Sequence, residues 1–410
     1  MNGPDQIVQE LQATLDRDPA LGDLLVKSLR RAGERAQADL DPDLRDALDW
    51  PRSLPEYYDY LRGFIRWVPR QSDAAAWRKS APHERYAQEV SDRLAHFFWL
   101  VDQKVDEKAD QEKNQEADGG GAAIAENSEP FRDWLTAFAR QWGGFLDTPE
   151  SFSQEVLESF LRDAPEYHVE ESLAGGRPNM PSGWLTFNQF FARELNPGLR
   201  PIRDPADNLV VTSPADCQFQ HSYGIDEASN IPRTTVKGTH HYGNIRQLIE
   251  GSRYADAFAG GSFTHYMLPP SAYHRYHVPV SGLVKESFVV SGKVFMQVDL
   301  EDGQLASKDS AKSGYEFSQT RGVLVLDTAE SEHGNLGLVA VVAVGMAHVA
   351  SVNLTTVEGT RVTKGEEFGY FQFGGSDIVV LFQDGAAPDI DSSQDFRHVG
   401  SVIARCRPAA

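Results

Sequence analysis

The chain has 410 residues and a mass of 45.5 kDa, which is enough for two or three domains. Its formal net charge of −21 argues against a nucleic-acid partner, because phosphate contacts need clustered lysine and arginine, and against a default affinity for anionic membranes. The two cysteines, Cys217 and Cys406, are too few for a disulfide framework, so we expect reduced thiols in a cytoplasmic protein. No stretch approaches the ~18 apolar residues of a transmembrane helix, and no signal peptide is recognisable.

The first third of the chain is predicted to be helical, because apolar residues recur there at helical spacing. We interpret its aromatic residues as packing residues rather than cofactor contacts. The pattern predicts a helical region at 1–102, an acidic and Gly-rich flexible segment at 103–129, and a helical continuation at 130–178. The residues that carry the helical pattern are Ile7, Leu11 and Leu15; Leu94, Phe97, Phe98 and Val101; and Phe131, Trp134, Leu135, Phe138, Trp142 and Phe145.

The pattern changes between residues 170 and 185. A short helix is expected over 187–195, ending at Asn196-Pro197-Gly198. Beyond it, short β-branched runs alternate with Gly and Pro turns, which is typical of strands. We therefore expect an α+β protein, with an N-terminal helical region followed by a β-rich domain at 179–410. The runs predicted as strands are 209–212, 278–284, 323–326, 339–344 and 378–382.

The segment Phe371-Gln372-Phe373-Gly374-Gly375-Ser376 carries the strongest chemical signal. The Ser376 hydroxyl can attack the carbonyl of Gly375, which no side chain shields, and form an ester. Loss of the serine α-proton then expels the ester and leaves a dehydroalanine, which water converts to a pyruvoyl group. On its own, a Gly-Gly-Ser sequence more often marks a plain turn between strands.

A histidine cluster lies upstream, in Tyr273-His274-Arg275-Tyr276-His277. A serine hydroxyl is a poor nucleophile until a base takes its proton, and histidine is the usual base. A third group usually orients that base, and Asp216 is the candidate. The alternatives are a surface or metal-binding histidine pair and a helix cap at Asp216. Metal binding is the weaker of these, because no carboxylate or thiol lies nearby at ligand spacing, so no metal site is expected.

In this combination and order, the motifs from about Thr186 to Leu381 resemble the phosphatidylserine decarboxylase family. Two departures stand out: Cys217 follows Asp216 where the family usually has glycine, and Gly-Gly-Ser-Asp replaces the Leu-Gly-Ser-Thr of many members. We expect the Gly-Gly-Ser to cleave equally well. The matching segments are 187–193, 197–202, 213–216, 236–238 with Leu248, 273–277 with Pro279 and Gly282, 344–352, and 364–371.

The resemblance implies an α+β protein with a phosphatidylserine-decarboxylase-like catalytic domain at 179–410 that cuts itself between Gly375 and Ser376. Asp216 and His277 would act with Ser376 in this cleavage, giving a β chain that ends at Gly375 and an α chain that starts at Ser376. The implied cofactor is the covalent pyruvoyl group derived from Ser376.

The resemblance also implies the reaction. The pyruvoyl carbonyl would form a Schiff base with the substrate amine, and the protonated imine would act as an electron sink while carbon dioxide leaves. His274 is our candidate for the proton donor that quenches the resulting carbanion. Tyr273 and Phe373 are candidate substrate-binding residues, because apolar groups there would shield the site from water.

The substrate is left open between two classes. Phosphatidylserine decarboxylation needs access to a membrane, usually through an apolar or amphipathic N-terminal segment, and this chain has a long acidic, Trp-bearing extension instead. That extension, Phe-Gly-Gly-Ser and Gly345-Met346 look like the soluble, tryptophan decarboxylase-like branch of the family. We therefore favour a free L-amino acid, aromatic such as tryptophan, with phosphatidylserine as the alternative.

Two readings from other classes remain. Asp216, His277 and Ser376 could form a hydrolase triad, although Gly-Gly-Ser-Asp lacks the flanking pattern of a nucleophile elbow. Alternatively, the β-rich domain could be an inactive binding scaffold that presents Lys237 or Lys364 on a turn, as lipoyl-like modules do.

Overall fold

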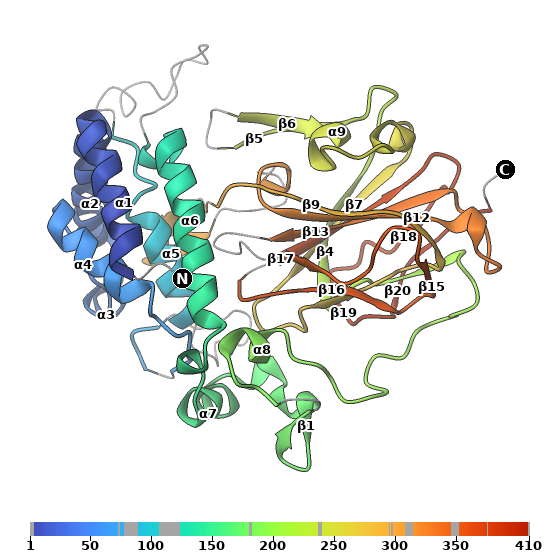
Figure 1. Ribbon diagram of the computed structural model, residues 1–410, viewed down its shortest axis with the longest axis horizontal. Helices are drawn as coiled ribbons and strands as arrows, with labels where there is room; N and C mark the ends of the chain where they lie inside the picture. Colours follow the sequence, from blue (N-terminus) through green and yellow to red (C-terminus); the bar gives the residue numbers. More distant parts are fainter. Residues whose placement is uncertain are drawn as a thin grey trace. The chain divides into compact units, whose positions relative to one another are not determined.

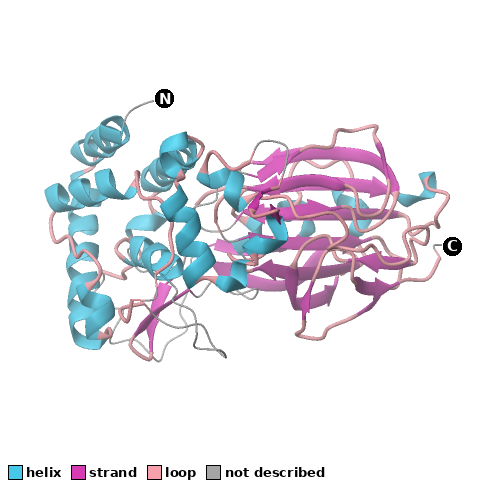
Figure 2. Cartoon of the chain, turned by 90° about the horizontal axis from the view of Figure 1, so that it is seen from below, coloured by secondary structure: helices cyan, strands magenta, loops and turns pink. Residues whose placement is uncertain are grey.

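The computed structural model describes residues 4–72, 74–77, 89–105, 124–179, 183–236, 240–294, 296, 298–307, 315–345, 352–374 and 376–408. Helices precede a β-rich region, which confirms the predicted α+β class (Figures 1 and 2). The chain divides into two compact units. The first comprises residues 1–167, 237–240 and 294–310, and the second comprises residues 168–236, 241–293 and 311–410.

The first unit is built mainly from helices. Among its described residues, no helix is long and apolar enough to cross a membrane, and the same holds for the described part of the second unit. Its helices are α1 (Pro4–Arg17), α2 (Pro19–Asp39), α3 (Pro42–Asp46), α4 (Leu54–Phe64), α5 (Glu89–Trp99), α6 (Glu129–Leu146) and α7 (Gln154–Asp163), with short 3₁₀ helices at Ala125–Asn127, Pro149–Ser151 and Pro165–Tyr167.

Aromatic side chains form the core of the first unit. Phe97 of α5 stacks on Phe64 of α4 and on Phe138 of α6, with ring centroids 4.5 and 5.5 Å apart. The ring of Trp142 of α6 lies 5.1 Å from that of Phe64, and its indole N–H donates to the backbone carbonyl of Trp67, just after α4. These contacts confirm that the aromatic stripe is a packing surface.

A β-hairpin that the sequence patterns did not indicate belongs to this unit. It consists of β10 (Val298–Glu301) and β11 (Gln304–Ser307). The Asp102 carboxylate accepts the backbone N–H of Val298, and Arg35 of α2 pairs with Asp299 of β10 at 3.1 Å. These polar contacts link the hairpin to residues far away in the sequence, which local periodicity cannot reveal.

The second unit contains an eight-stranded antiparallel sheet in the order β15-β9-β12-β13-β17-β7-β4-β19. Two three-stranded sheets, β14-β16-β8 and β18-β20-β3, accompany it. The strands are β1 (Leu173–Ala174), β2 (Arg177–Pro178), β3 (Val210–Thr212), β4 (Cys217–Gly224), β5 (Asn230–Val236), β6 (His240–Asn244), β7 (Ser262–Leu268), β8 (Arg275–His277), β9 (Gly282–Val290), β12 (Arg321–Asp327), β13 (Leu338–Gly345), β14 (Val352–Leu354), β15 (Arg361–Val362), β16 (Glu367–Phe371), β17 (Ser376–Phe382), β18 (Asp389–Ile390), β19 (Phe396–Arg397) and β20 (Val402–Arg405).

Few helices interrupt these strands. They are α8 (Phe187–Phe191), α9 (Ile245–Leu248) and the 3₁₀ helices Val169–Ser172, Ala255–Phe258, Tyr315–Phe317 and Thr328–Glu330. Helix α8 is shorter than the helix predicted over 187–195. The strand predicted over 278–284 is displaced toward the C-terminus, because β9 runs from Gly282 to Val290. The other four predicted strands are confirmed.

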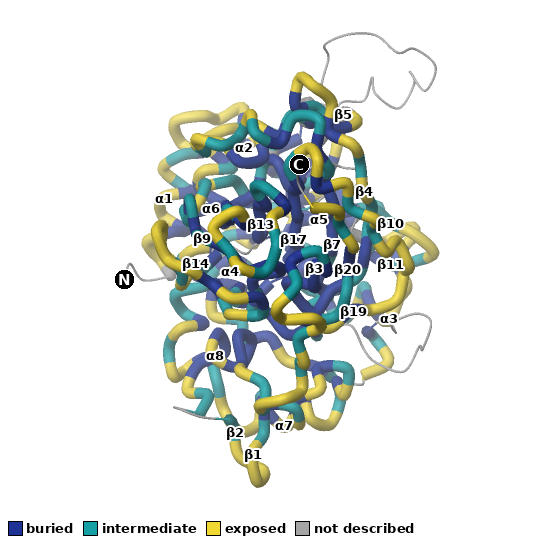
Figure 3. Tube along the Cα trace, turned by 90° about the vertical axis from the view of Figure 1, so that its right-hand side faces the viewer, coloured by how far each residue is buried: buried dark blue, intermediate teal, exposed yellow. Residues whose placement is uncertain are grey.

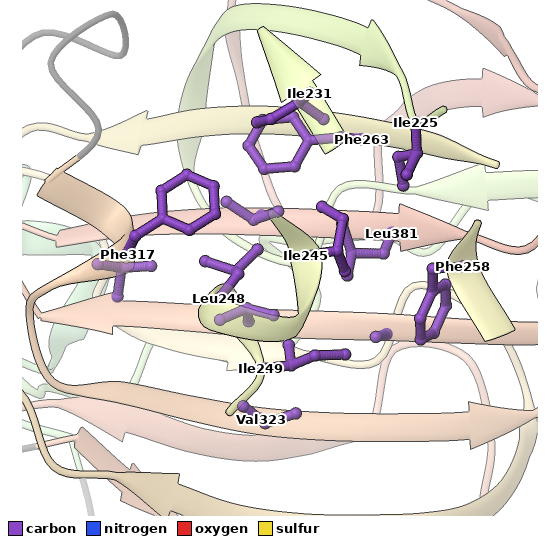
Figure 4. Packing of buried hydrophobic residues seen from close by; sticks show 14 of the residues in the cluster. Ile225, Ile231, Ile245, Leu248, Ile249, Phe258, Phe263, Phe317, Val323 and Leu381 are labelled. Atoms are coloured by element: carbon purple, nitrogen blue, oxygen red, sulfur yellow. The ribbon is translucent and has the colours of Figure 1, made fainter. Parts of the chain in front are cut away.

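Both faces of the large sheet are covered, so its central strands β13 and β17 are buried along almost their whole length (Figure 3). One face carries an apolar cluster that includes Val379 of β17 and side chains of α9 (Figure 4). On the other face, a side chain at Gly322 of β12 would meet Val352 of β14 at 2.6 Å. Because side chains alternate along a strand, Asp377 shares the face of Val379, and Ser376 points to the opposite face.

Candidate active site

Ser376 is the first residue of the central strand β17. Its backbone is paired with Gly345 of β13 on one side and Leu268 of β7 on the other. The side chain is fully buried, and its hydroxyl has no hydrogen-bond partner among the described residues. Gly374, two residues earlier, has φ of 147°, a conformation that favours glycine. Gly375, the expected cleavage position, lies outside the described residues.

The segment that precedes Ser376 lies against His274. The backbone N–H of Phe371 donates to the carbonyl of His274 at 2.9 Å. The ring of Phe373 packs edge-on against Phe191 of α8, and Phe191 in turn stacks on the His274 ring with centroids 4.0 Å apart. Asn188 of α8 fixes the same segment, because its side-chain oxygen accepts the N–H of Phe373. Residues from α8 and the loop before β8 therefore hold the approach to Ser376.

His274 is a neutral imidazole in this environment. Its side chain is fully buried, and neither ring nitrogen has a hydrogen-bond partner among the described residues. Burial, together with the nearby charge of Arg193, lowers the pKa of His274 to about 3. One ring nitrogen therefore carries a hydrogen at neutral pH and the other carries a lone pair, so the side chain can both give and take a proton.

His277, the last residue of β8, has a defined tautomer. Its Nδ1 lies 2.8 Å from the carbonyl oxygen of Gly365, which can only accept, so Nδ1 carries the hydrogen. Nε2 therefore has the lone pair and accepts from the Tyr273 hydroxyl, 3.1 Å away. Burial lowers the pKa of His277 and raises that of Tyr273. The result is a neutral histidine whose Nε2 is a base.

Asp216 lies just before β4, and its buried carboxylate is fully engaged. Arg200 donates to it through Nε at 3.0 Å and Nη2 at 2.6 Å. His398 contributes Nδ1 at 3.0 Å, and the backbone N–H of Val399 donates at 2.8 Å. Burial opposes ionisation of the Asp216 carboxyl, but hydrogen bonds from His398 and Arg200 outweigh it and lower its pKa. Asp216 is therefore an ionised carboxylate.

The structure corrects one expectation about these residues. Asp216 was the candidate for orienting His277, but the group that fixes His277 Nδ1 is the carbonyl of Gly365. Within the described part of the chain, no hydrogen bond joins Asp216 to His277 or either residue to Ser376. The segments are nevertheless adjacent, because the N–H of His277 donates to the carbonyl of Pro214. The charge of Asp216 also raises the pKa of His277, although less than burial lowers it.

Several polar residues of this site had no assigned role in the sequence. Arg200 lies within the matched segment 197–202, yet nothing local to it indicated a partner. Asn188 lies within the matched segment 187–193 and His398 lies outside every matched segment, and neither revealed its partner, which is 185 residues away for Asn188 and 182 residues away for His398. The roles of Asp216, His274, His277, Ser376, Tyr273 and Phe373 in a reaction stay predictions.

The sequence profile of the phosphatidylserine decarboxylase family matches residues 187–405, which is more than half of the chain. The match spans all the site residues described above. The chain therefore belongs to the phosphatidylserine decarboxylase family, whose members are carboxy-lyases.

Individual relatives agree with this membership. Phosphatidylserine decarboxylase proenzyme 2 of Oryza sativa subsp. japonica is 30% identical over 257 residues, covering 62% of this chain and 37% of that protein. A phosphatidylserine decarboxylase proenzyme of Clostridium perfringens is 31% identical over 246 residues, covering 60% and 74%. Decarboxylase iboD of Amanita muscaria is 28% identical over 303 residues, covering 68% and 85%. The chain thus spans little more than a third of the rice protein but most of the other two.

Proposed function

We propose that the chain is a proenzyme that cuts itself before Ser376 and then decarboxylates an amine-bearing carboxylate. The observation that carries the proposal is the position of Ser376 at the start of a central strand, inside the region that matches the family. Its hydroxyl is buried and has no hydrogen-bond partner among the residues that the structure describes. Two relatives that bear the name proenzyme support it.

The residues present fit a pyruvoyl group at position 376. The Ser376 hydroxyl is a buried polar atom without a partner among the described residues, and the preceding Phe373 lies in an aromatic layer with Phe191. When formed, the group would supply a carbonyl that condenses with an amine and withdraws electrons as carbon dioxide leaves. His277 would take the proton from the Ser376 hydroxyl through Nε2, the nitrogen that lacks a hydrogen.

His274 is the candidate proton donor. Its ring is held by stacking on Phe191 and by the contact of its carbonyl with Phe371. Because its pKa is lowered to about 3, the donor at neutral pH would be the N–H of a neutral imidazole rather than an imidazolium. The aromatic layer would exclude water from the same place, which favours loss of a charged carboxylate.

For the substrate we propose a free L-amino acid, aromatic such as tryptophan. Decarboxylase iboD matches 68% of this chain and is itself covered over 85% of its length, and its name, unlike those of the rice and clostridial relatives, does not specify phosphatidylserine. The net charge of −21 favours a small soluble substrate over an anionic membrane surface. Phosphatidylserine is the second candidate, because it stands in the names of the rice and clostridial relatives.

We also propose a cytoplasmic location, which the two free cysteines support.

The test measures intact mass and carbon dioxide release with purified wild-type and Ser376→Ala protein. Wild type is expected to split into two chains and to release carbon dioxide from free tryptophan, tyrosine or phenylalanine. Ser376→Ala is expected to stay whole and inactive. Release from phosphatidylserine vesicles alone would overturn the proposed substrate, and efficient cutting of Ser376→Ala would overturn the mechanism.

The geometry argues against a hydrolase triad. In such a triad the aspartate accepts the Nδ1 hydrogen of the histidine, whereas here that hydrogen is donated to the carbonyl of Gly365.

One of the two lysines on which a binding scaffold would depend is not available. Lys364 donates from Nζ to the carbonyls of Asp204, Asp207 and Val210 and is 5% exposed, so it is not presented on the surface. Lys237 lies outside the described residues.

A further inference from the structure

A second cluster of chemically active side chains lies on the sheet face opposite to Ser376. His221 of β4 and His265 of β7 are direct cross-strand partners, with ring centroids 5.1 Å apart. Glu316, from the 3₁₀ helix Tyr315–Phe317, lies beside them. One ligand atom from each of these three residues falls within 4.8 Å of the other two. Three elements far apart in the sequence thus bring two imidazoles and a carboxylate together.

The orientation of His265 leaves one nitrogen directed away from its protein partner. Its Nε2 lies 2.6 Å from the carboxylate of Asp377, which also accepts a hydrogen bond from the Tyr315 hydroxyl. Nε2 is therefore the donor, and the lone pair of neutral His265 is on Nδ1. This carboxylate–imidazole arrangement is the one that commonly supports a metal-ligating histidine, because it fixes the ring and raises its basicity.

The polar atoms at the centre of the cluster are buried without partners. His265 is completely buried and Glu316 is 1% exposed. Among the described residues, neither Nδ1 of His265 nor Oε2 of Glu316 has a hydrogen-bond partner. A buried carboxylate oxygen in that state costs free energy unless a cation or a proton compensates it.

We propose that His221, His265 and Glu316 form a binding site for a divalent transition-metal ion of the zinc type. Two imidazoles and a carboxylate are a donor set that Zn²⁺ takes in proteins, with a fourth position left for water. An ion about 2 Å from each ligand atom would place those atoms about 3.3 Å apart. The ligand atoms now lie within 4.8 Å of one another, so side-chain rotations that move each atom by about 1 Å would bring them to that separation. His221 is only half-buried, which gives the ion a route from solvent.

Asp377 connects this site to the predicted cleavage position. It is the outer partner of His265 and the residue that follows Ser376 in β17. An ion at the cluster would hold His265, and through it the Asp377 side chain, in one arrangement. The metal site does not depend on the proposed reaction, because its ligands come from β4, β7 and the 3₁₀ helix, which are present in the uncut chain.

The experiment titrates chelator-treated full-length protein with Zn²⁺ in a calorimeter, using wild type and the uncut Ser376→Ala chain. One equivalent is expected to bind in both. His221→Asn and Glu316→Gln are each expected to weaken binding by about 100-fold or more, since each removes a direct ligand. The matched control is His168→Asn, which removes an exposed histidine that also lies beside a glutamate, at 3.3 Å, and should leave binding unchanged.

A second measurement on wild type alone covers the case in which a variant fails to fold. X-ray absorption of the zinc-loaded protein is expected to show two imidazole nitrogens and oxygen in the coordination shell. Absence of stoichiometric binding, a shell without two imidazoles, or equal affinity in folded wild type, His221→Asn and Glu316→Gln would overturn the proposal. In that case the cluster would be a buried proton-sharing network.

Discussion

Arg200 donates hydrogen bonds from Nε and Nη2 to the carboxylate of Asp216. The side chain of Arg200 is 12% exposed and that of Asp216 is 3% exposed. The same guanidinium reaches Glu171 at 2.8 Å. Arg200 comes from the loop before β3, whereas His398 and Val399, which also bond to Asp216, follow β19 near the end of the chain. The bonds of Asp216 to Arg200, His398 and Val399 therefore join segments on both sides of the predicted cleavage position.

Removing Arg200 should be costly. Arg200→Ala leaves a buried carboxylate without its main partner, and breaking such a pair typically costs about 3–5 kcal/mol of the free energy of unfolding. Urea denaturation in the Ser376→Ala background measures this on a single uncut chain. Arg361→Ala is the control, because it breaks a pair with Glu330 that is 65% and 46% exposed and should cost less than about 1 kcal/mol. Equal costs for the two variants would contradict the assignment.

The contribution of the Asp216 carboxylate to the free energy of unfolding should depend on pH. Its pKa is lower in the folded than in the unfolded state, so its stabilisation is complete above the unfolded value of about 4 and is lost as the pH falls through the folded value. The cost of Asp216→Asn should therefore be largest near neutral pH and should shrink as the pH is lowered below about 4. Denaturation curves of both proteins at several pH values measure this difference, and a cost that is constant with pH would refute it.

His274 should produce a separate pH effect. Its pKa is about 3 when folded and about 6.5 when unfolded, so below pH 6.5 the unfolded chain binds a proton that the folded chain does not. The free energy of unfolding should then fall by up to about 1.4 kcal/mol for each pH unit between about 6 and 4. His274→Leu should show a shallower slope over that interval. Identical slopes would mean that the His274 imidazole is not held neutral.

The proposed tie between Lys364 and three carbonyls can be tested with a nearly isosteric change. Lys364→Met removes the ammonium and leaves the carbonyls of Asp204, Asp207 and Val210 without this donor, which should cost about 2–4 kcal/mol. Lys285→Met is the control, because its ammonium lies 4.0 Å from Asp327 in a partly exposed pair and should contribute under about 1 kcal/mol. Thermal unfolding of both variants decides between a structural and a surface lysine.

The local pattern of apolar residues was enough to predict many of the helices and strands. The helical stripes through Leu11 and Phe138 and the strand over 378–382 were predictable, because burial of one face imposes a period that the sequence must display. The family motifs identified His277 and Ser376 as candidate site residues. The carbonyl of Gly365 that holds His277 and the Phe191 ring that stacks on His274 were not predictable, since they reach the site only through tertiary folding.

Tertiary contacts also explain why the sequence pattern predicted neither the hairpin over 298–307 nor the cluster of His221, His265 and Glu316. The hairpin over 298–307 joins the helical unit through contacts with Arg35 and Asp102, and no periodicity records such a contact. His221, His265 and Glu316 lie on separate elements, so their spacing in sequence resembles no ligand motif. Cross-strand register, which sets His221 opposite His265, is fixed by the sheet as a whole.

The interior position of β17 has a consequence for the life of the protein. If the chain is cut before Ser376, this strand becomes the start of a separate polypeptide, yet it stays hydrogen-bonded between β13 and β7. The two pieces would then behave as one body until the sheet opens. Once it opened, they would diffuse apart, and reassembly would become a bimolecular event whose yield depends on concentration. The uncut chain could therefore refold in a unimolecular step, whereas the cut protein could recover its fold only if its two chains met again.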